Sequence, residues 1–216
     1  QYDPYYGSDP SLFRPLTEFL FNNAEYRRLY TAHLRTVINE IDTNQIRSEV
    51  QTMQAMAYTA MDNDIHKLFS SADYFNNVEQ DISNLAWGGY GFGGIMSCLR
   101  HRIPFLLAHS EISVTPPNIF NVQVDNGIIT ANVNNESYVE LMATVSEYNS
   151  KFTSFNMYDD GTNGDDQTND GIYSCYVPFA TSPLVKFYVK ARNSQAMMLS
   201  PERAEYEFYE YYSISH

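Results

Sequence analysis

The clearest hydrophobic pattern in the first half of the chain is a stripe of apolar residues at three- and four-residue spacing over residues 24–41. This spacing is typical of an amphipathic helix. Asn23 is a suitable N-cap for it, and Glu25 would meet the positive end of the helix dipole in the first turn. The stripe comprises Tyr26, Leu29, Tyr30, His33, Leu34, Val37, Ile38 and Ile41.

The same spacing predicts four more helices, which begin near Pro15, Thr43, Ser71 and Ile95. Thr43 and Ser71 are the expected N-caps of the third and fourth helices. The last helix is expected over residues 95–109, where Pro104 should kink it or split it, because proline removes a hydrogen bond and clashes with the preceding turn. The first half therefore predicts a helical bundle.

Beyond residue 116 the hydrophobic pattern changes to alternation, which indicates strands with one buried face. Asn126-Gly127 is a strong signal for a tight hairpin. The expected strands cover residues 119–124, 128–133, 138–145, 152–157, 172–177, 184–189 and 204–212. Seven short strands in about 100 residues predict an antiparallel β-sandwich of immunoglobulin-like or fibronectin type III-like character.

Paired prolines separate the two patterns. Pro116 and Pro117 stiffen an extended connector and exclude a helix there. We therefore predict an α+β chain of two domains, an all-α helical domain over residues 1–115 and an antiparallel Ig-like β-sandwich over residues 116–216.

Composition narrows the classes of partner. The chain has 13 Lys and Arg against 26 Asp and Glu, a formal net charge of −13. A basic surface for nucleic acid or a polybasic membrane anchor is not expected, and no apolar run approaches the roughly 18–20 residues needed to cross a bilayer. No secretory h-region follows Gln1, so any signal peptide is expected to be removed already or never present.

Motifs for catalysis are weak. The glycines in residues 89–94 satisfy G-x-G-x-x-G, but a dinucleotide site needs a preceding strand, and here the pattern predicts a helix, so a helix–helix connector is the favoured interpretation. The five histidines (His33, His66, His101, His109 and His216) show no metal-binding i, i+4 pair. Cys98 and Cys175 are too few for a disulfide framework or a zinc site and are expected to be buried small hydrophobes. We expect no catalytic residue and no organic cofactor.

One acidic segment could hold a cation. Residues 159–171 contain three glycines and five carboxylates, those of Asp159, Asp160, Asp165, Asp166 and Asp170. Calcium prefers six to eight oxygen ligands, which such a loop can supply. Two EF-hand frames fail, because Gly161 replaces a ligand in one and Val177 replaces the bidentate Glu in the other. Asp and Asn side chains can instead stabilise an ordered hairpin loop through bonds to the backbone. We favour this interpretation and expect weak calcium binding at most.

Two groups of residues carry a family resemblance. Residues 23–35 (Asn-Ala-Glu-Tyr-Arg-Arg-Leu-Tyr-Thr-Ala-His-Leu-Arg), preceded by Pro15-Leu16 and Phe19-Leu20, resemble the segment that closes a CotH-type domain, with Arg102-Ile103-Pro104-Phe105-Leu106 matching its last helix. CotH-type proteins are the spore-coat-type, kinase-like proteins of bacteria. The second half resembles the β-sandwich that follows such domains in secreted proteins, through residues 156–161, 164–165, 170–173, 177–178, 188–193, 200–201 and 205–212.

The resemblance implies both an identity and a limit. In that family a Lys, acidic residues and a Trp-Asp-Leu-Asp-like stretch hold nucleotide and metal, and all lie upstream of the matched region. Nothing in this chain matches them, so the chain is expected to be the C-terminal part of a longer protein, cut after its catalytic core. The helices at residues 26–41 and 95–109 should then have an apolar face that the missing partner would cover, and we expect the chain either to self-associate through that face or to repack it against the sandwich.

The expected function is that of a non-catalytic accessory or interaction region of an exported CotH-type protein, secreted or in the bacterial cell envelope. Its expected partners are the upstream kinase-like domain and an envelope protein or glycan. One alternative is the C-lobe remnant of an atypical protein kinase. A second is a carbohydrate-binding accessory module, because ten of the 18 tyrosines follow residue 116 and tyrosine supplies flat amphipathic contact area.

Overall fold

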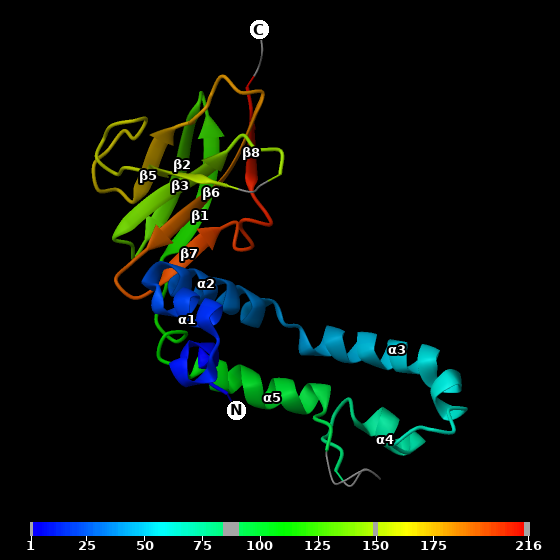
Figure 1. The fold of residues 1–216 in the computed structure, drawn as a ribbon. Coiled ribbons are helices and arrows are strands. Elements are labelled where there is room, and N and C mark those ends of the chain that lie inside the picture. The colour runs from blue at the N-terminus through cyan, green and yellow to red at the C-terminus, as the bar shows by residue number, and fades with distance from the viewer. Residues whose placement is uncertain (1, 84–90, 149–150, 214–216) are drawn as a thin grey trace. The chain divides into compact units, whose positions relative to one another are not determined.

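The computed structural model describes residues 2–83, 91–148 and 151–213, and its fold is α+β with antiparallel sheets (Figure 1). The helices are α1 (Pro15–Asn22), α2 (Ala24–Glu40), α3 (Thr43–Asp62), α4 (Ser71–Asn76) and α5 (Ile95–Leu107), preceded by two 3₁₀ turns, Tyr6–Ser8 and Pro10–Leu12. The strands are β1 (Asn118–Asp125), β2 (Ile128–Asn134), β3 (Tyr138–Thr144), β4 (Thr153–Asn156), β5 (Ile172–Tyr176), β6 (Leu184–Arg192), β7 (Met197–Ser200) and β8 (Tyr209–Tyr212).

The helix starts follow from local capping chemistry. Asn23 caps α2 as expected, since its side-chain oxygen accepts hydrogen bonds from the backbone N–H groups of Glu25 and Tyr26. The expected caps of α3 and α4 were each wrong by one residue. Asp42 accepts from two backbone N–H groups at the start of α3, and Ser70 forms a capping box with Asp73 at the start of α4.

Two helix lengths differ from expectation. Helix α4 ends at Asn76, and the buried Val78 and Ile82 lie in the turn and bridge that follow it. Helix α5 is not split at Pro104. It runs without a break from Ile95 to Leu107, and Pro104 lies inside it.

Contacts within the chain divide it into two compact units, residues 1–4 with 37–109, and residues 5–36 with 110–216. This division does not follow the expected boundary between residues 115 and 116, since α1 and most of α2 belong with the strands. The first unit contains α3, α4 and α5. Within this unit Glu79, which lies between α4 and α5, connects two helices. Its carboxylate forms ion pairs with Arg47 of α3 and with Arg100 of α5.

The second unit contains two antiparallel sheets. The three-stranded sheet has the order β1-β2-β5, and the five-stranded sheet has the order β4-β3-β6-β7, with β8 also paired to β6. β1 and β2 form the expected hairpin around Asn126-Gly127, with Asp125 opposite Ile128. Strand β7 was missed, and the expected strand 204–212 is shorter, because β8 begins at Tyr209.

One hydrophobic core lies between the two sheets. Strands β2, β3 and β6 alternate in burial, so that every second side chain enters this core. Its buried members are Ile129, Ala131, Val133, Val139, Leu141, Ala143, Met157, Cys175, Val177, Val185, Phe187, Val189 and Ala191. The alternation that predicted the strands is therefore the pattern that fills the core.

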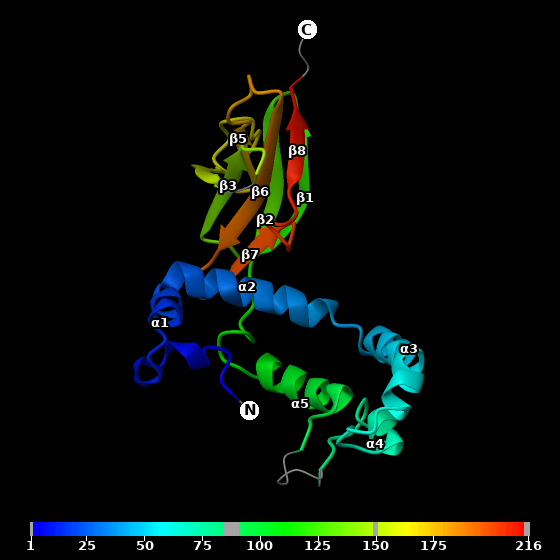
Figure 2. The same ribbon diagram turned by 45° about the vertical axis from the view of Figure 1, so that its right-hand side comes forward.

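Helix α2 joins this unit at the end of the sheets, where it lies beside β7 and the adjoining end of β6 (Figures 1 and 2). Leu29 packs against a second hydrophobic cluster formed by Phe152, Tyr188, Met197, Leu199 and Ala204. Arg27 forms an ion pair with Glu111, and Arg35 donates to the carbonyl of Ile112. These contacts explain why residues 5–36 fold with the strands.

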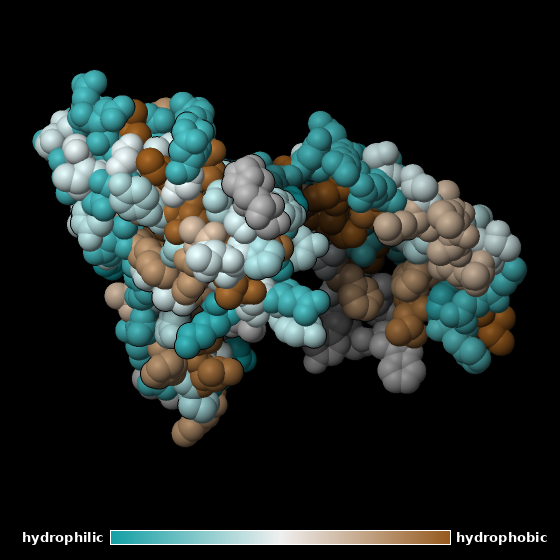
Figure 3. Space-filling model, turned by 90° about the horizontal axis from the view of Figure 1, so that it is seen from above, coloured by the Kyte–Doolittle hydropathy of each residue, from teal (hydrophilic) through white to brown (hydrophobic). Residues whose placement is uncertain are grey.

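Hydrophobic side chains also reach the surface in the helical segments, as the brown areas of Figure 3 show. Helices α1 and α3 have no buried residue in the described chain. The stripe on α2 is only partly covered, since Leu29 packs against the sheet unit while Tyr26, Tyr30 and Val37 remain exposed. The same holds for α5, where Ile95, Phe105 and Leu107 are exposed. No described helix is both long and apolar enough to cross a membrane.

Candidate functional site

The acidic segment forms an ordered loop between β4 and β5. Asp159 accepts hydrogen bonds from the backbone N–H groups of Asp170 (3.1 Å) and Gly171 (3.0 Å). Asp165 accepts from Gly161 (2.8 Å) and Gln167 (3.2 Å). The carboxylates thus hold the loop together through turn chemistry, as the sequence predicted.

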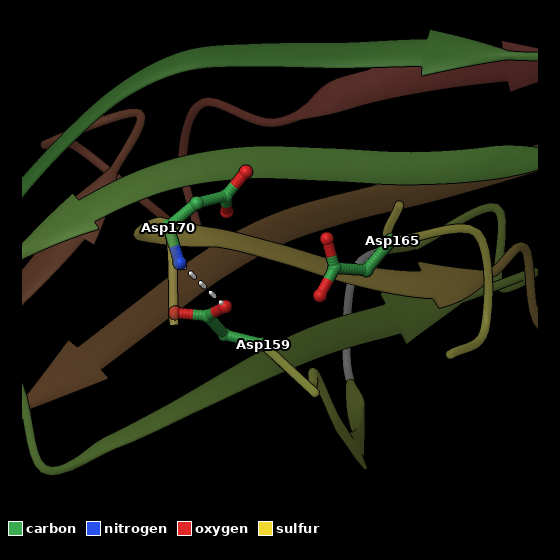
Figure 4. A group of neighbouring side chains, drawn as sticks. All are labelled: Asp159, Asp165 and Asp170. Carbon is green, nitrogen blue, oxygen red and sulfur yellow. Dashed lines mark hydrogen bonds between the residues drawn. The ribbon is translucent and has the colours of Figure 1, made fainter. Parts of the chain in front are cut away.

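Three of the five expected ligand residues come together in this loop. One carboxylate oxygen from each of Asp159, Asp165 and Asp170 lies within 4.8 Å of the others (Figure 4). Asp165 is buried, with only 6% of its surface exposed. In the described chain this is the one cluster of at least three His, Cys, Asp or Glu residues with metal-ligand spacing.

The other two aspartates are not part of the cluster. Asp160 accepts hydrogen bonds from the backbone N–H (3.0 Å) and hydroxyl (2.5 Å) of Thr162, and Asp166 is exposed. A cation at the cluster would share the carboxylates of Asp159 and Asp165 with backbone donors that already occupy them. Calcium would also need several more oxygens than three carboxylates offer singly.

The loop folds back over the outer face of the three-stranded sheet. The buried hydroxyl of Ser174 on β5 donates toward the carbonyl oxygens of Thr162 and Asn163, both at 3.2 Å. Gly164 lies directly over Ile128, so closely that a Cβ there would be 2.5 Å from Ile128 Cγ2. The loop therefore covers sheet surface, which is a structural role.

A second polar cluster, which sequence reasoning missed, joins α2 to the five-stranded sheet. Lys190 Nζ of β6 lies 2.9 Å from a carboxylate oxygen of Glu25 on α2 and 2.9 Å from one of Glu140 on β3. The side chains of Lys190 and Glu140 are only 12% and 11% exposed. We call Lys190, Glu25 and Glu140 the lysine brace.

The electrostatics of the lysine brace favour its charged form. Burial opposes the charge on Lys190, but the hydrogen bonds that it donates to Glu140 and Glu25 outweigh this effect and raise the pKa of Lys190 above its ordinary value. Burial likewise opposes ionisation of Glu140, yet hydrogen bonds from Ser154 and Lys190 prevail and lower the pKa of that carboxyl. Both side chains are therefore charged at neutral pH.

The signal for this brace is faint in the sequence. Strand β6 alternates buried apolar residues with Lys186, Tyr188, Lys190 and Arg192 on its other face. That pattern marks an outward polar face. It gives no hint that Glu25, 165 positions earlier in the chain, provides the partner.

Other residues considered for chemistry have ordinary structural environments. Cys175 is buried in the core between the sheets, and this burial raises the pKa of its thiol to about 12, so it is a poor nucleophile. Cys98 is exposed on α5, contrary to the expectation of burial. Burial lowers the pKa of the half-buried His33, which suits the expected place at the edge of the core. The glycine-rich segment lies partly outside the described residues, since 84–90 are not described.

The helical unit contains an apolar pocket of about 370 Å³ between α3, α4 and the start of α5. Its polar side chains already bind the backbone around it. Gln54 donates to the carbonyl of Tyr74, and Asn77 donates to those of Gln80 and Phe92. These bonds shape the pocket wall and leave its interior to hydrophobic side chains.

Comparison with known proteins gives no independent assignment: no family model matches the chain, and neither the curated proteins nor the solved structures include one with significant similarity.

Proposed function

We propose that the chain is a non-catalytic accessory region of an exported CotH-type protein of the bacterial cell envelope, in which helix α2 holds an Ig-like β-sandwich in a fixed position. The observation that carries this proposal is the lysine brace, with Lys190 paired to Glu25 of the helix and to Glu140 of the sheet. The brace supports the part of the proposal that makes α2 and the sheets one binding module.

The lysine brace attaches α2 firmly to the five-stranded sheet because its charged groups are largely buried. A largely buried ammonium group requires its counter-charges, and loss of either partner leaves a charge without compensation. Leu29 adds apolar contact with the cluster around Tyr188 and Leu199. Arg28 adds a hydrogen bond to the carbonyl of Ser194 in the β6–β7 turn. Helix and sheet are thus held by charge, packing and hydrogen bonding together.

The non-catalytic role is supported by the environment of the candidate groups. The carboxylates of Asp159 and Asp165 hold backbone N–H groups, and the thiol of Cys175 is buried. The resemblance to CotH-type proteins assigns nucleotide and metal binding to residues upstream of this chain. We accordingly propose that any phosphoryl transfer belongs to the parent protein.

The proposed partner within the parent protein is the upstream kinase-like domain. Helix α1 exposes Leu16 and Phe19, and Phe13 just before it is also exposed. A neighbouring domain that covered these side chains would remove apolar surface from water. A partner in the envelope, either protein or glycan, would bind elsewhere on the sandwich.

Nucleotide binding by the full chain tests this proposal against the alternative of a kinase C-lobe remnant. The melting temperature of the chain should be the same with and without ATP and Mg²⁺, and incubation with γ-labelled ATP should label neither the chain nor a generic acceptor protein. A nucleotide-dependent rise of several degrees, or transfer of label, would contradict the accessory role.

A further inference from the structure

The outer face of the five-stranded sheet has two halves with different surroundings. Around Met142, Tyr188 and Leu199 it is apolar and packs against Leu29 and Ala204. Toward the edge strand β4 it consists of polar and aromatic side chains, namely Tyr138, Ser154 and Asn156, and Tyr158 follows at the edge where the chain leaves β4 and bridges Ser174 of β5. Tyr158 is 42% exposed, and Ser154 and Asn156 are exposed as well.

These side chains form a continuous row across the strands. The Tyr138 hydroxyl donates to Asn156 Oδ1, and Asn156 Nδ2 lies 3.4 Å from the Tyr158 hydroxyl. On the other side, the guanidinium of Arg192 lies 4.7 Å from the ring centroid of Tyr138. Arg192 is opposite Tyr138 in the ladder between β6 and β3. We call Tyr138, Asn156, Tyr158 and Arg192 the tyrosine row.

The charges beside the tyrosine row are balanced. Lys190 and Arg192 supply two positive charges, and both bind Glu25, while Lys190 also binds Glu140. The two cations beside the row are therefore already paired and give no site for a phosphate group or an acidic polymer, and Asp159 and Asp160 directly after Tyr158 disfavour an anionic ligand further. This surface favours a neutral ligand.

The chemistry of the row suits sugar rings. Tyrosine offers an apolar ring face for the C–H side of a pyranose and a hydroxyl that donates and accepts. The Asn156 amide and the Arg192 guanidinium add donors for ring hydroxyls. Arg192, Tyr138 and Asn156 stand on the adjacent strands β6, β3 and β4, and Tyr158 follows β4 where the chain bridges Ser174 of β5. The four groups contact one another in sequence, so little conformational entropy is lost when a ligand binds.

We propose that the tyrosine row binds a neutral oligosaccharide chain laid across β4, β3 and β6. This deepens the proposed function and rests on it, because it names the ligand class of the accessory module. The sugar chain would run from Tyr158, just beyond the end of β4, over Asn156 and then across β3 toward Tyr138 and Arg192. Its C–H faces would contact the tyrosine rings, and its hydroxyls would bind Asn156.

Calorimetric titration of the full chain with cellohexaose, xylohexaose and chitohexaose tests the proposal. At least one should bind, and Tyr158→Ala and Asn156→Ala should each weaken that binding about tenfold, which corresponds to about 1.4 kcal/mol. Tyr206→Ala is the matched control, since Tyr206 is 84% exposed and lies outside the row, and it should bind as the parent chain does.

Two outcomes overturn the proposal: no heat of binding with any of the three sugars, or binding that Tyr158→Ala leaves unchanged. Circular dichroism and melting of each variant separate loss of binding from loss of folding. These outcomes are distinct from failure of the accessory role. If the chain binds neither sugar nor ATP, the glycan site is wrong and the accessory role stands. If the chain responds to ATP, the accessory role is wrong whatever the sugar result.

Discussion

Lys190 and Glu25 meet at 2.9 Å although 165 positions separate them in the chain. Their contact links the start of α2 to β6, close to the end of that strand. It ties the helix to the unit that contains the β-sheets.

Removing the Lys190 charge should destabilise the chain markedly. In Lys190→Met the carboxylate of Glu140 stays in its largely buried place without its cation, and breaking such a pair costs about 3 kcal/mol. Urea unfolding measures the change in the free energy of unfolding. Lys151→Met is the matched control, because Lys151 is exposed, and it should change stability by less than about 0.5 kcal/mol. Equal stability of the two variants would show that the brace contributes nothing.

The close approach of the acidic loop to the sheet predicts a steric effect at Gly164. A Cβ in Gly164→Ala would collide with Ile128 and would sit at a φ of +96°, so we expect a loss of about 2–4 kcal/mol. Gly127→Ala is the control, because its φ of +78° imposes similar backbone strain in open space. It should cost about 1–2 kcal/mol. If both variants lose the same free energy, the loop does not pack on Ile128.

Calcium should bind the acidic loop weakly. Because backbone donors already occupy Asp159 and Asp165, the dissociation constant should fall in the range of about 10⁻⁴–10⁻³ M seen for extracellular calcium modules. Calorimetry on EDTA-stripped chain measures it. Micromolar binding that Asp165→Ala or Asp170→Ala abolishes would establish a true metal site. Without calcium, Asp165→Ala should still be less stable than the control Asp166→Ala, since only Asp165 is buried and bonded to two N–H groups.

Stability should fall at alkaline pH. Burial raises the pKa of Cys175 from 9.0 to about 12, and burial with a hydrogen bond to Glu136 raises that of Tyr173 from 10.0 to about 12. The unfolded chain loses these protons first, so their stabilisation is complete below about pH 9 and is lost as pH rises toward 12. Unfolding in urea between pH 8 and pH 11 should show a continuous decrease. A flat profile would contradict the burial of both groups.

Much of the fold is local and could be predicted from the sequence. Asn23 caps α2 through its own side chain, and Asn126-Gly127 sets the β1–β2 hairpin, because each depends on neighbours a few positions away. The cap of α3 shows the limit of such reasoning. Asp42 and Thr43 are both suitable caps, and the choice depends on which side chain reaches the N–H groups of Asn44 and Gln45.

Long-range features could not be predicted in this way. Strand β7 is short, and the sequence around Met197 and Leu199 shows no turn signal of the strength of Asn-Gly. The acidic pattern identified the loop at residues 159–171, but only the folded chain brings Asp159, Asp165 and Asp170 together and leaves Asp160 and Asp166 outside. The partnership of Lys190 with α2 depends on tertiary packing alone.

Native-state hydrogen exchange tests the central claim, that α2 and the sheets form one braced module. The account predicts that amides in residues 24–36 of α2 and in β6 open with the same free energy and that Lys190→Met lowers both by the same amount. Exchange of the α2 amides through a separate, lower-energy opening, with β6 still protected and unaffected by Lys190→Met, would contradict it.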